Sequence, residues 1–125
     1  MIIVNEDNSI YLTRGDDVAF EVGAISKGEP ITFNVGDKIH FTVTKKKNCG
    51  NVVIDKTVPV NAETEVVIMR LTNEETKIGE VISKPVDYWY DIELIDRHGN
   101  TYTIVGYDKE GAKIFRLFPE GEAAR

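Results

Sequence analysis

Short runs in which apolar and polar side chains alternate recur along this chain, and they restrict its possible folds more than any other feature. Residues 17–22 and 38–44 are the clearest, since each run places three apolar side chains on one face. Alternation with a period of two predicts β-strands with one buried face. Further runs of this kind occupy residues 9–13, 31–33, 51–58, 63–71, 87–95, 101–105 and 113–118. The chain is therefore predicted to be all-β.

Turns rich in glycine separate these runs, and one segment favours a helical turn. Thr72 and Glu75 have the spacing of a capping box, which predicts a helix start, and Gly79 ends the helix. About eight short strands with one helical turn near residues 73–78 are typical of an antiparallel β-sandwich, with a small barrel as the alternative. Both faces of the run at 63–71 are partly apolar, so we expect that strand to lie in the middle of a sheet.

Length and composition fit one domain. A chain of 125 residues with 42% hydrophobic residues is long enough to bury a core of its own. We expect residues 1–125 to form a single β-sandwich domain, with residues 1–8 as an N-terminal extension and residues 119–125 as a frayed tail.

The net charge, the apolar start and the single cysteine limit the classes of partner and the compartment that we expect. The net charge of −6 argues against nucleic acid or an anionic membrane as the main partner, and the one basic run, residues 45–47, is predicted to be a loop tip. The apolar start at residues 1–4 is too short for a signal peptide or a membrane helix. Cys49, the single cysteine, lies in a polar turn and is expected to be exposed and reduced, which indicates folding in a reducing cytoplasm.

The sequence contains no pattern that predicts an active site. It has no glycine-rich phosphate loop, no strained serine turn and no zinc-ligand spacing around His40 and His98. The tripeptide Arg14-Gly15-Asp16 is interpreted as a turn. Calcium binding by loop aspartates is weighed and not favoured, because they lack the spacing of a calcium loop. These aspartates are Asp7, Asp16, Asp17, Asp87 and Asp96. We therefore expect no enzyme activity, no cofactor and no metal.

Aromatic side chains are the remaining candidates for binding. Tyr88 and Tyr90 fall on the apolar face of their predicted strand, so they are expected in the core. Trp89 shares the opposite face with Asp91 and Glu93, which is the wetter side. Flat aromatic rings bind sugars and partner proteins, and Trp89 is therefore the predicted binding residue.

Four segments together resemble a known family of small phage and prophage structural proteins of Gram-positive bacteria, similar to the N-terminal domain of baseplate upper proteins. The segments are Arg14-Gly15-Asp16 before Val18-Ala19-Phe20-Glu21-Val22, then Gly36-Asp37 before Lys38-Ile39-His40-Phe41-Thr42-Val43, then Leu71-Thr72-Asn73-Glu74-Glu75-Thr76, and finally Tyr88-Trp89-Tyr90-Asp91-Ile92-Glu93-Leu94 with Gly99 and Thr103-Ile104-Val105. The resemblance implies an immunoglobulin-like β-sandwich in the tail or baseplate of a virion, without catalytic residues. It implies other virion proteins, or further copies of the chain, as partners.

Three hypotheses follow from these observations. The leading one is a structural or attachment protein of a phage virion, made in the bacterial cytoplasm, that uses an exposed sheet edge or loop end as its interface. The second is a carbohydrate-binding or adhesion module that uses Trp89. The third is a hydrolase with loop carboxylates, which requires a deep pocket with perturbed acids.

Overall fold

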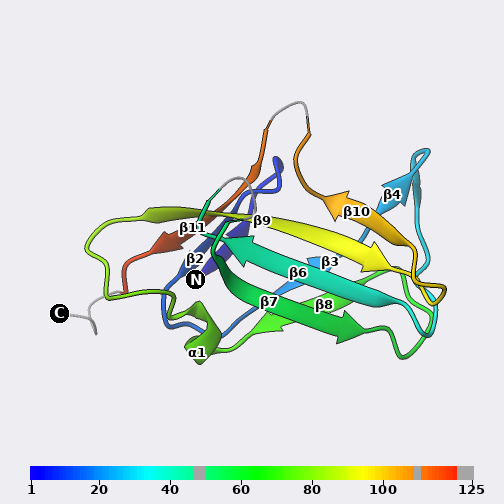
Figure 1. Ribbon diagram of the computed structural model, residues 1–125, viewed down its shortest axis with the longest axis horizontal. Helices are drawn as coiled ribbons and strands as arrows, with labels where there is room; N and C mark the ends of the chain where they lie inside the picture. Colours follow the sequence, from blue (N-terminus) through cyan, green and yellow to red (C-terminus); the bar gives the residue numbers. More distant parts are fainter. Residues whose placement is uncertain (47–49, 109–110, 121–125) are drawn as a thin grey trace.

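The computed structural model describes residues 1–46, 50–108 and 111–120, and nearly all regular structure in these ranges is β-strand. One large sheet contains most of the strands (Figure 1). Its order is β1 (Ile2–Val4), β2 (Ile10–Thr13), β11 (Lys113–Phe118), β9 (Val86–Ile95), β6 (Lys38–Thr44) and β7 (Val52–Pro59), and β10 (Thr101–Val105) also pairs with β9. The predicted all-β class is confirmed.

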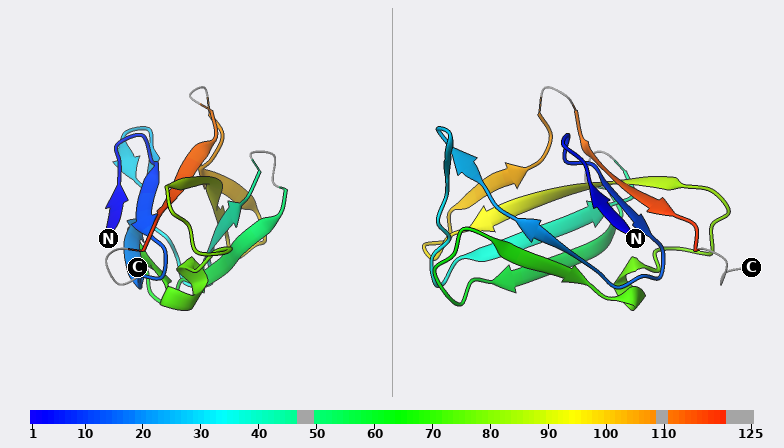
Figure 2. Two further views of the ribbon diagram at one scale, coloured as in Figure 1. Left: turned by 90° about the vertical axis from the view of Figure 1, so that its left-hand side faces the viewer. Right: turned by 180° about the vertical axis from the view of Figure 1, so that it is seen from behind.

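A second, smaller sheet faces the large one. It pairs β3 (Val18–Val22) with β8 (Val67–Leu71), and β4 (Ile25–Ser26) and β5 (Glu29–Pro30) form a separate hairpin. The strands surround a common interior (Figure 2). Phe20 of β3 and Phe41 of β6 meet there with ring centroids 5.5 Å apart, so the two sheets share one core.

The alternation in the sequence explains which side chains fill this core. Apolar residues on one face of β3 and β6 are buried, and Phe115 and Leu117 on one face of β11 are fully buried. Tyr88 and Tyr90 are buried as predicted, at 6% exposure each. Burial of whole aromatic and branched side chains is the main stabilising contribution in a domain of this size.

One strand pairing differs from the predicted antiparallel arrangement. β2 and β11 are parallel, with Leu12 opposite Leu117. Parallel neighbours need a long connection, and here almost the whole chain lies between the two strands. No hairpin turn therefore fixes their relative direction, and the large sheet is mixed.

The strand predicted at 63–71 was placed wrongly. Within the described residues β8 begins at Val67 and pairs only with β3, so it is not a central strand. Val66 and Ile68 are 42% and 40% exposed. Apolar residues on both faces suggested two buried faces, but the second sheet has only two strands and one of its faces remains open to solvent.

The short strand predicted at 31–33 is also wrong. Lys27 and Gly28 both have positive φ, 53° and 79°, which is the backbone of a two-residue hairpin turn. This turn places the returning strand at Glu29–Pro30. Phe33 contributes only an isolated bridge to Thr64, although its side chain is fully buried.

The predicted helical turn is present as α1 (Asn73–Thr76). The Thr72 hydroxyl accepts a hydrogen bond from the Glu75 amide at 3.2 Å, and the Glu75 carboxylate accepts one from the Thr72 amide at 2.9 Å. The capping box is thus confirmed. The helix ends at Thr76, before Gly79, because Lys77 leaves helical geometry with ψ of 59°.

Both ends of the described chain make contacts with the rest of the fold. Residues 1–8, the predicted extension, include β1, which pairs with β2. The tail predicted at 119–125 lies mostly outside the described residues, but Glu120 forms an ion pair with Arg14.

Candidate functional site

Trp89 is half-buried on the face of β9 that points away from the core, together with Asp91 and Glu93. The register places Thr44 of β6 opposite Trp89, Thr42 opposite Asp91 and His40 opposite Glu93. On the other side of β6, β7 places Asp55 opposite Thr42. We call the surface formed by these residues the outer face: His40, Thr42, Thr44, Asp55, Trp89, Asp91 and Glu93.

A small hollow of about 80 Å³ lies at the Trp89 end of the outer face. Its walls include Trp89, Asp91 and the two threonines of β6. Tyr107, which is 79% exposed, and Lys113, whose Nζ lies 2.9 Å from a carboxylate oxygen of Asp108, complete it. Lys113 lies opposite Tyr90 in the register and is buried on the core-facing side of β11 with Phe115 and Leu117, so its ammonium group is not on the same face as Trp89 and Asp91.

The Asp91 carboxylate is the least satisfied acid of the outer face. Within the described part of the chain it makes no hydrogen bond or ion pair. Burial, and then the nearby charge of Glu93, raise the pKa of Asp91, while His40 lowers it. A half-buried carboxylate with no protein donor is free to accept hydrogen bonds from a ligand.

His40 links the three strands of the outer face. Its Nε2 lies 2.6 Å from Asp55 Oδ1 on β7, and its Nδ1 lies 3.2 Å from Glu93 Oε1 on β9. Burial alone lowers the pKa of His40, but the two carboxylates outweigh that effect, so the net pKa is raised. The imidazole therefore favours its charged form, which donates from both nitrogens.

Thr42 also belongs to the hydrogen-bond network around His40. Thr42 Oγ1 lies 3.3 Å from His40 Nε2, as a nucleophile beside a base does. The same nitrogen lies 2.6 Å from Asp55 Oδ1, so the hydroxyl and the carboxylate share it. β6 is paired on both edges, so its amides are committed to sheet hydrogen bonds rather than to an oxyanion.

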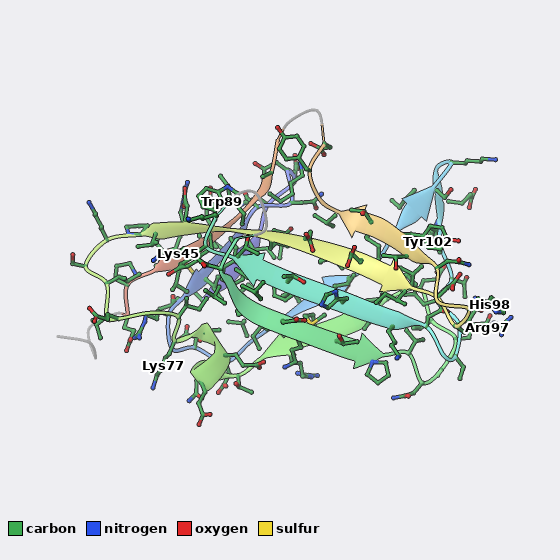
Figure 3. All side chains as sticks on the ribbon, viewed as in Figure 1. Lys45, Lys77, Trp89, Arg97, His98 and Tyr102 are labelled. Atoms are coloured by element: carbon green, nitrogen blue, oxygen red, sulfur yellow. The ribbon has the colours of Figure 1, made fainter. Side chains whose placement is uncertain are left out.

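The metal candidates are not brought together. Within the described ranges, no group of three or more His, Cys, Asp or Glu side chains has the geometry to hold a metal ion. His98 lies in the exposed turn between β9 and β10 (Figure 3), whereas His40 lies on β6. Each of the five loop aspartates considered for calcium interacts with a protein donor instead. The donors are Ser9 for Asp7, the N-terminal amine for Asp16, Asn73 for Asp17, Arg116 for Asp87, and Asn100 for Asp96.

Hydrogen bonds to distant parts of the chain hold the Arg14-Gly15-Asp16 turn in place. Arg14 is 7% exposed and donates to the carbonyl oxygens of Ile78, at 3.3 Å, and Gly79, at 2.7 Å. The hydroxyl of Thr76, which is fully buried, donates to the Asp16 carbonyl at 2.8 Å and accepts from the Gly15 amide at 3.0 Å. Sequence reasoning found both segments but missed that they join, because no local pattern links residues so far apart.

A second hollow, of about 550 Å³, is mostly apolar and shares no lining residue with the first. We call it the β10 groove. One wall is β10, which pairs with β9 alone within the described residues, so its other edge is open. Two large side chains in the lining are exposed, Ile25 at 75% and Tyr102 at 54%.

Comparison with known proteins finds no match: no family model, no curated protein and no solved structure corresponds to this chain. Among the described residues, no helix is both long and apolar enough to cross a lipid bilayer. The predictions made for Cys49 and for Lys47 of the basic run concern residues outside the described ranges.

Proposed function

We propose that this protein is a non-enzymatic structural or attachment component of a phage or prophage virion, in the tail or baseplate, and that it acts through protein–protein contacts. The observation on which this depends is the β10 groove. An apolar hollow beside an unpaired strand edge is the arrangement by which a sheet accepts an extended segment of another chain. The occupant is a segment of another virion protein or of a second copy.

The exposed residues of the β10 groove support contact with a protein. Ile25 of β4 and Tyr102 of β10 both line the groove and are largely exposed. Exposed apolar surface of this kind is typical of a protein contact site. The backbone groups along the open edge of β10 need partners that another strand supplies. Backbone hydrogen bonds between β10 and the added strand give affinity, and the side chains of the added strand that fit into the hollow give specificity.

The strand order supports the immunoglobulin-like form of the sandwich. The sequence β11-β9-β6-β7 in the large sheet corresponds to the G-F-C-C′ order of a variable-type immunoglobulin sheet, and β3–β8 corresponds to the B–E pair that faces it.

Static light scattering over a wide concentration series tests the contact. We expect the apparent mass of the protein to rise with concentration, and Ile25→Lys to weaken association about tenfold or more, because a charge in an apolar interface is costly. Val81→Lys is the matched control, since Val81 is 68% exposed and lies outside the groove. Equal loss in both variants contradicts a role for the groove.

Location in the virion has a separate test. Phage particles induced from the host that encodes this chain, purified and analysed by mass spectrometry, are expected to contain the protein in stoichiometric amount. Particles that lack it contradict the proposal, whatever the oligomeric state of the isolated chain.

A further inference from the structure

We propose that copies of this chain join head to tail, with β1 of one copy paired to the open edge of β10 in the next copy and Ile3 placed in the β10 groove. This inference rests on the proposed function and deepens it, because it names the occupant of the groove as the first strand of a second copy. β1, beside the N-terminus, and β10 lie at different parts of the molecule (Figure 2). The contact therefore joins two different surfaces of the chain.

β1 and β10 differ from the other open strands in their charge. Apart from the two-residue strands β4 and β5, the strands with an unpaired edge in the described part of the chain are β1, β3, β7, β8 and β10. Charged residues lie on β3, β8 and β7, namely Glu21, Arg70, Asp55 and Lys56, and charge on an edge strand opposes pairing with another chain. β1 and β10 contain neither a charged residue nor a proline. These two edges are therefore the ones suited to pairing.

The backbone of β1 has free groups on its open edge. Hydrogen-bonded and non-hydrogen-bonded pairs alternate along an antiparallel ladder. Just beyond β1, the Asn5 amide donates to the Ser9 carbonyl at 2.9 Å. Counting back from that pair, Ile3 bonds to β2, and the N–H and C=O groups of Ile2 and Val4 face the open edge.

The same alternation applies to β10. The Asp96 amide donates to the Asn100 carbonyl at 2.8 Å just before β10 begins. Tyr102 therefore bonds to β9, and the N–H and C=O groups of Thr101 and Thr103 face the open edge. On β1 and on β10 alike the free groups recur at every second residue. Antiparallel pairing of the two strands gives each of these groups a partner.

This register determines which side chain enters the β10 groove. When Ile2 and Val4 pair with the two threonines, Ile3 lies directly opposite Tyr102. Opposite residues share one face of a sheet, and Tyr102 lines the groove, so Ile3 enters it. The Ile3 side chain is 47% exposed in its own chain, and the contact removes this apolar surface from water.

The net charge of the chain favours the same pair of surfaces. Two copies with a charge of −6 each repel one another, and the repulsion is smallest where uncharged strands meet. Because β1 is only three residues long, few hydrogen bonds form. The contact is therefore expected to be weak, with Kd on the order of 100 μM.

A head-to-tail contact has a consequence for assembly. A copy whose groove is occupied still presents its own β1, so further copies can be added. Contacts between different surfaces produce a closed ring or a filament, whereas contact between two identical surfaces stops at a dimer. We therefore expect assemblies larger than two copies.

Complementation between two blocked variants tests the contact by light scattering. Ile3→Lys blocks β1 and Ile25→Lys blocks the groove, so each variant alone is expected to remain monomeric at concentrations where the unchanged protein assembles. An equal mixture of the two is expected to form a complex of two copies and nothing larger, because one intact β1 meets one intact groove. Val81→Lys is the matched control, since Val81 is exposed and lies outside both surfaces, and it is expected to assemble fully. Circular dichroism spectra check that each variant is folded.

A disulfide tests the register directly. In a background with Cys49→Ser, Ile3→Cys protein is mixed with Tyr102→Cys protein under mild oxidation. Opposite residues of a non-hydrogen-bonded pair lie close enough for a disulfide, so a covalent dimer is expected in the mixture and in neither variant alone. Val81→Cys in place of Ile3→Cys is the control and is expected to give no covalent dimer.

Several results overturn the head-to-tail contact. They are full assembly of Ile3→Lys, a mixture of the blocked variants that stays monomeric, and an unchanged protein that stays monomeric. Ile3→Lys protein that forms dimers by itself also overturns it, and indicates contact between two grooves, which leaves the groove as the interface of the proposed function. The protein content of purified phage particles decides the proposed function separately, whatever the way in which isolated copies join.

Discussion

At the scale of single residues, Thr76 has an unusual position for a hydroxyl. It is fully buried at the end of α1, and it bridges the Gly15 amide and the Asp16 carbonyl of the turn that follows β2. The turn has no other side-chain partner at these two backbone groups among the described residues. The hydroxyl therefore joins the connector between β8 and β9 to the start of the second sheet.

Replacing this hydroxyl with a methyl group tests the bridge. Thr76→Val keeps the shape and removes the side-chain partner of a partly buried amide and carbonyl, so we expect the free energy of unfolding to fall by about 1–2 kcal/mol. Thr57→Val is the control, because Thr57 is exposed on β7. Urea denaturation measures both, and similar values for the two variants contradict a bridging role.

Asp91 has the opposite effect on stability. Its pKa is raised by burial and by Glu93, so the folded state disfavours the ionised carboxylate. A carboxyl group with a raised folded-state pKa destabilises the protein above that pKa, and the penalty disappears as pH falls below the unfolded value. Residues that reduce stability are common at binding sites, which agrees with the place of Asp91 beside Trp89.

Asp91→Asn is therefore expected to stabilise the protein at pH 7, by a few tenths to about 1 kcal/mol, since the side chain still contacts water. Thermal unfolding at neutral pH measures the gain, and repeating it at acidic pH is expected to show the gain shrinking. Asp55→Asn is the comparison, and it is expected to destabilise, because Asp55 is paired with His40. A destabilising Asp91→Asn contradicts the unpaired carboxylate.

At the scale of strands, His40 connects β7, β6 and β9 through side chains as well as through the backbone ladder. The groups that face it are Asp55 from β7, and Glu93 and Asp91 from β9. Its pKa is raised in the folded protein. The contribution to stability is therefore complete below the ordinary histidine pKa of about 6.5 and is lost as pH rises through the folded-state value.

His40→Asn is expected to cost more stability at pH 5.5 than at pH 8.5, with a difference on the order of 1 kcal/mol or less. His98→Asn is the matched control, because His98 is exposed in a turn, and its cost is expected to be small at both values. Urea midpoints at the two pH values measure the difference. A cost for His40→Asn that does not change with pH contradicts a charged link between the strands.

The same scale shows why the sequence predicts some strands and not others. β3, β6, β9 and β11 follow from alternation, because each has one buried face and the pattern is local. β10 has no buried residue, and it follows instead from the turn at Gly99 that returns the chain beside β9. The parallel pairing of β2 with β11 and the edge position of β8 depend on which distant strands meet, and no local pattern encodes that. β4 and β5 were missed because the residues of their turn, Lys27 and Gly28, place the hairpin before the predicted strand.

The candidate site likewise combines a part that a local pattern predicts with a part that depends on long-range strand pairing. Alternation within one strand places Trp89, Asp91 and Glu93 on one face, and that much is predictable from the sequence. His40 and Asp55 join them only through the register across three strands, which the long-range pairing sets. The neighbourhood of Tyr107 and Lys113 depends on where the chain returns after β10.

At the scale of the whole molecule, β2 near the start of the chain and the last strand, β11, lie side by side in the large sheet. The Arg14 amide donates to the Phe118 carbonyl at 3.0 Å where β2 and β11 end, and the Arg14 side chain is paired with Glu120. The ends of the described chain are therefore held at one part of the molecule, while the β10 groove lies beside β4 at another (Figure 1). The lining of the groove includes no residue of β2 or β11, although Asn8 of the turn before β2 borders it.

Net charge sets how a second copy approaches the groove. Each copy has a net charge of −6, so two copies repel each other at low ionic strength, while the groove they share is apolar. Added salt screens the repulsion and does not weaken contacts between apolar side chains. Self-association through the β10 groove is therefore expected to strengthen as sodium chloride is raised from about 20 to about 300 mM, a range over which the screening length falls several-fold. Light scattering at fixed protein concentration measures the change, with Ile25→Lys as the variant that is expected to remain monomeric throughout. Dissociation on adding salt contradicts the groove as the interface, because it indicates that ion pairs hold the copies together.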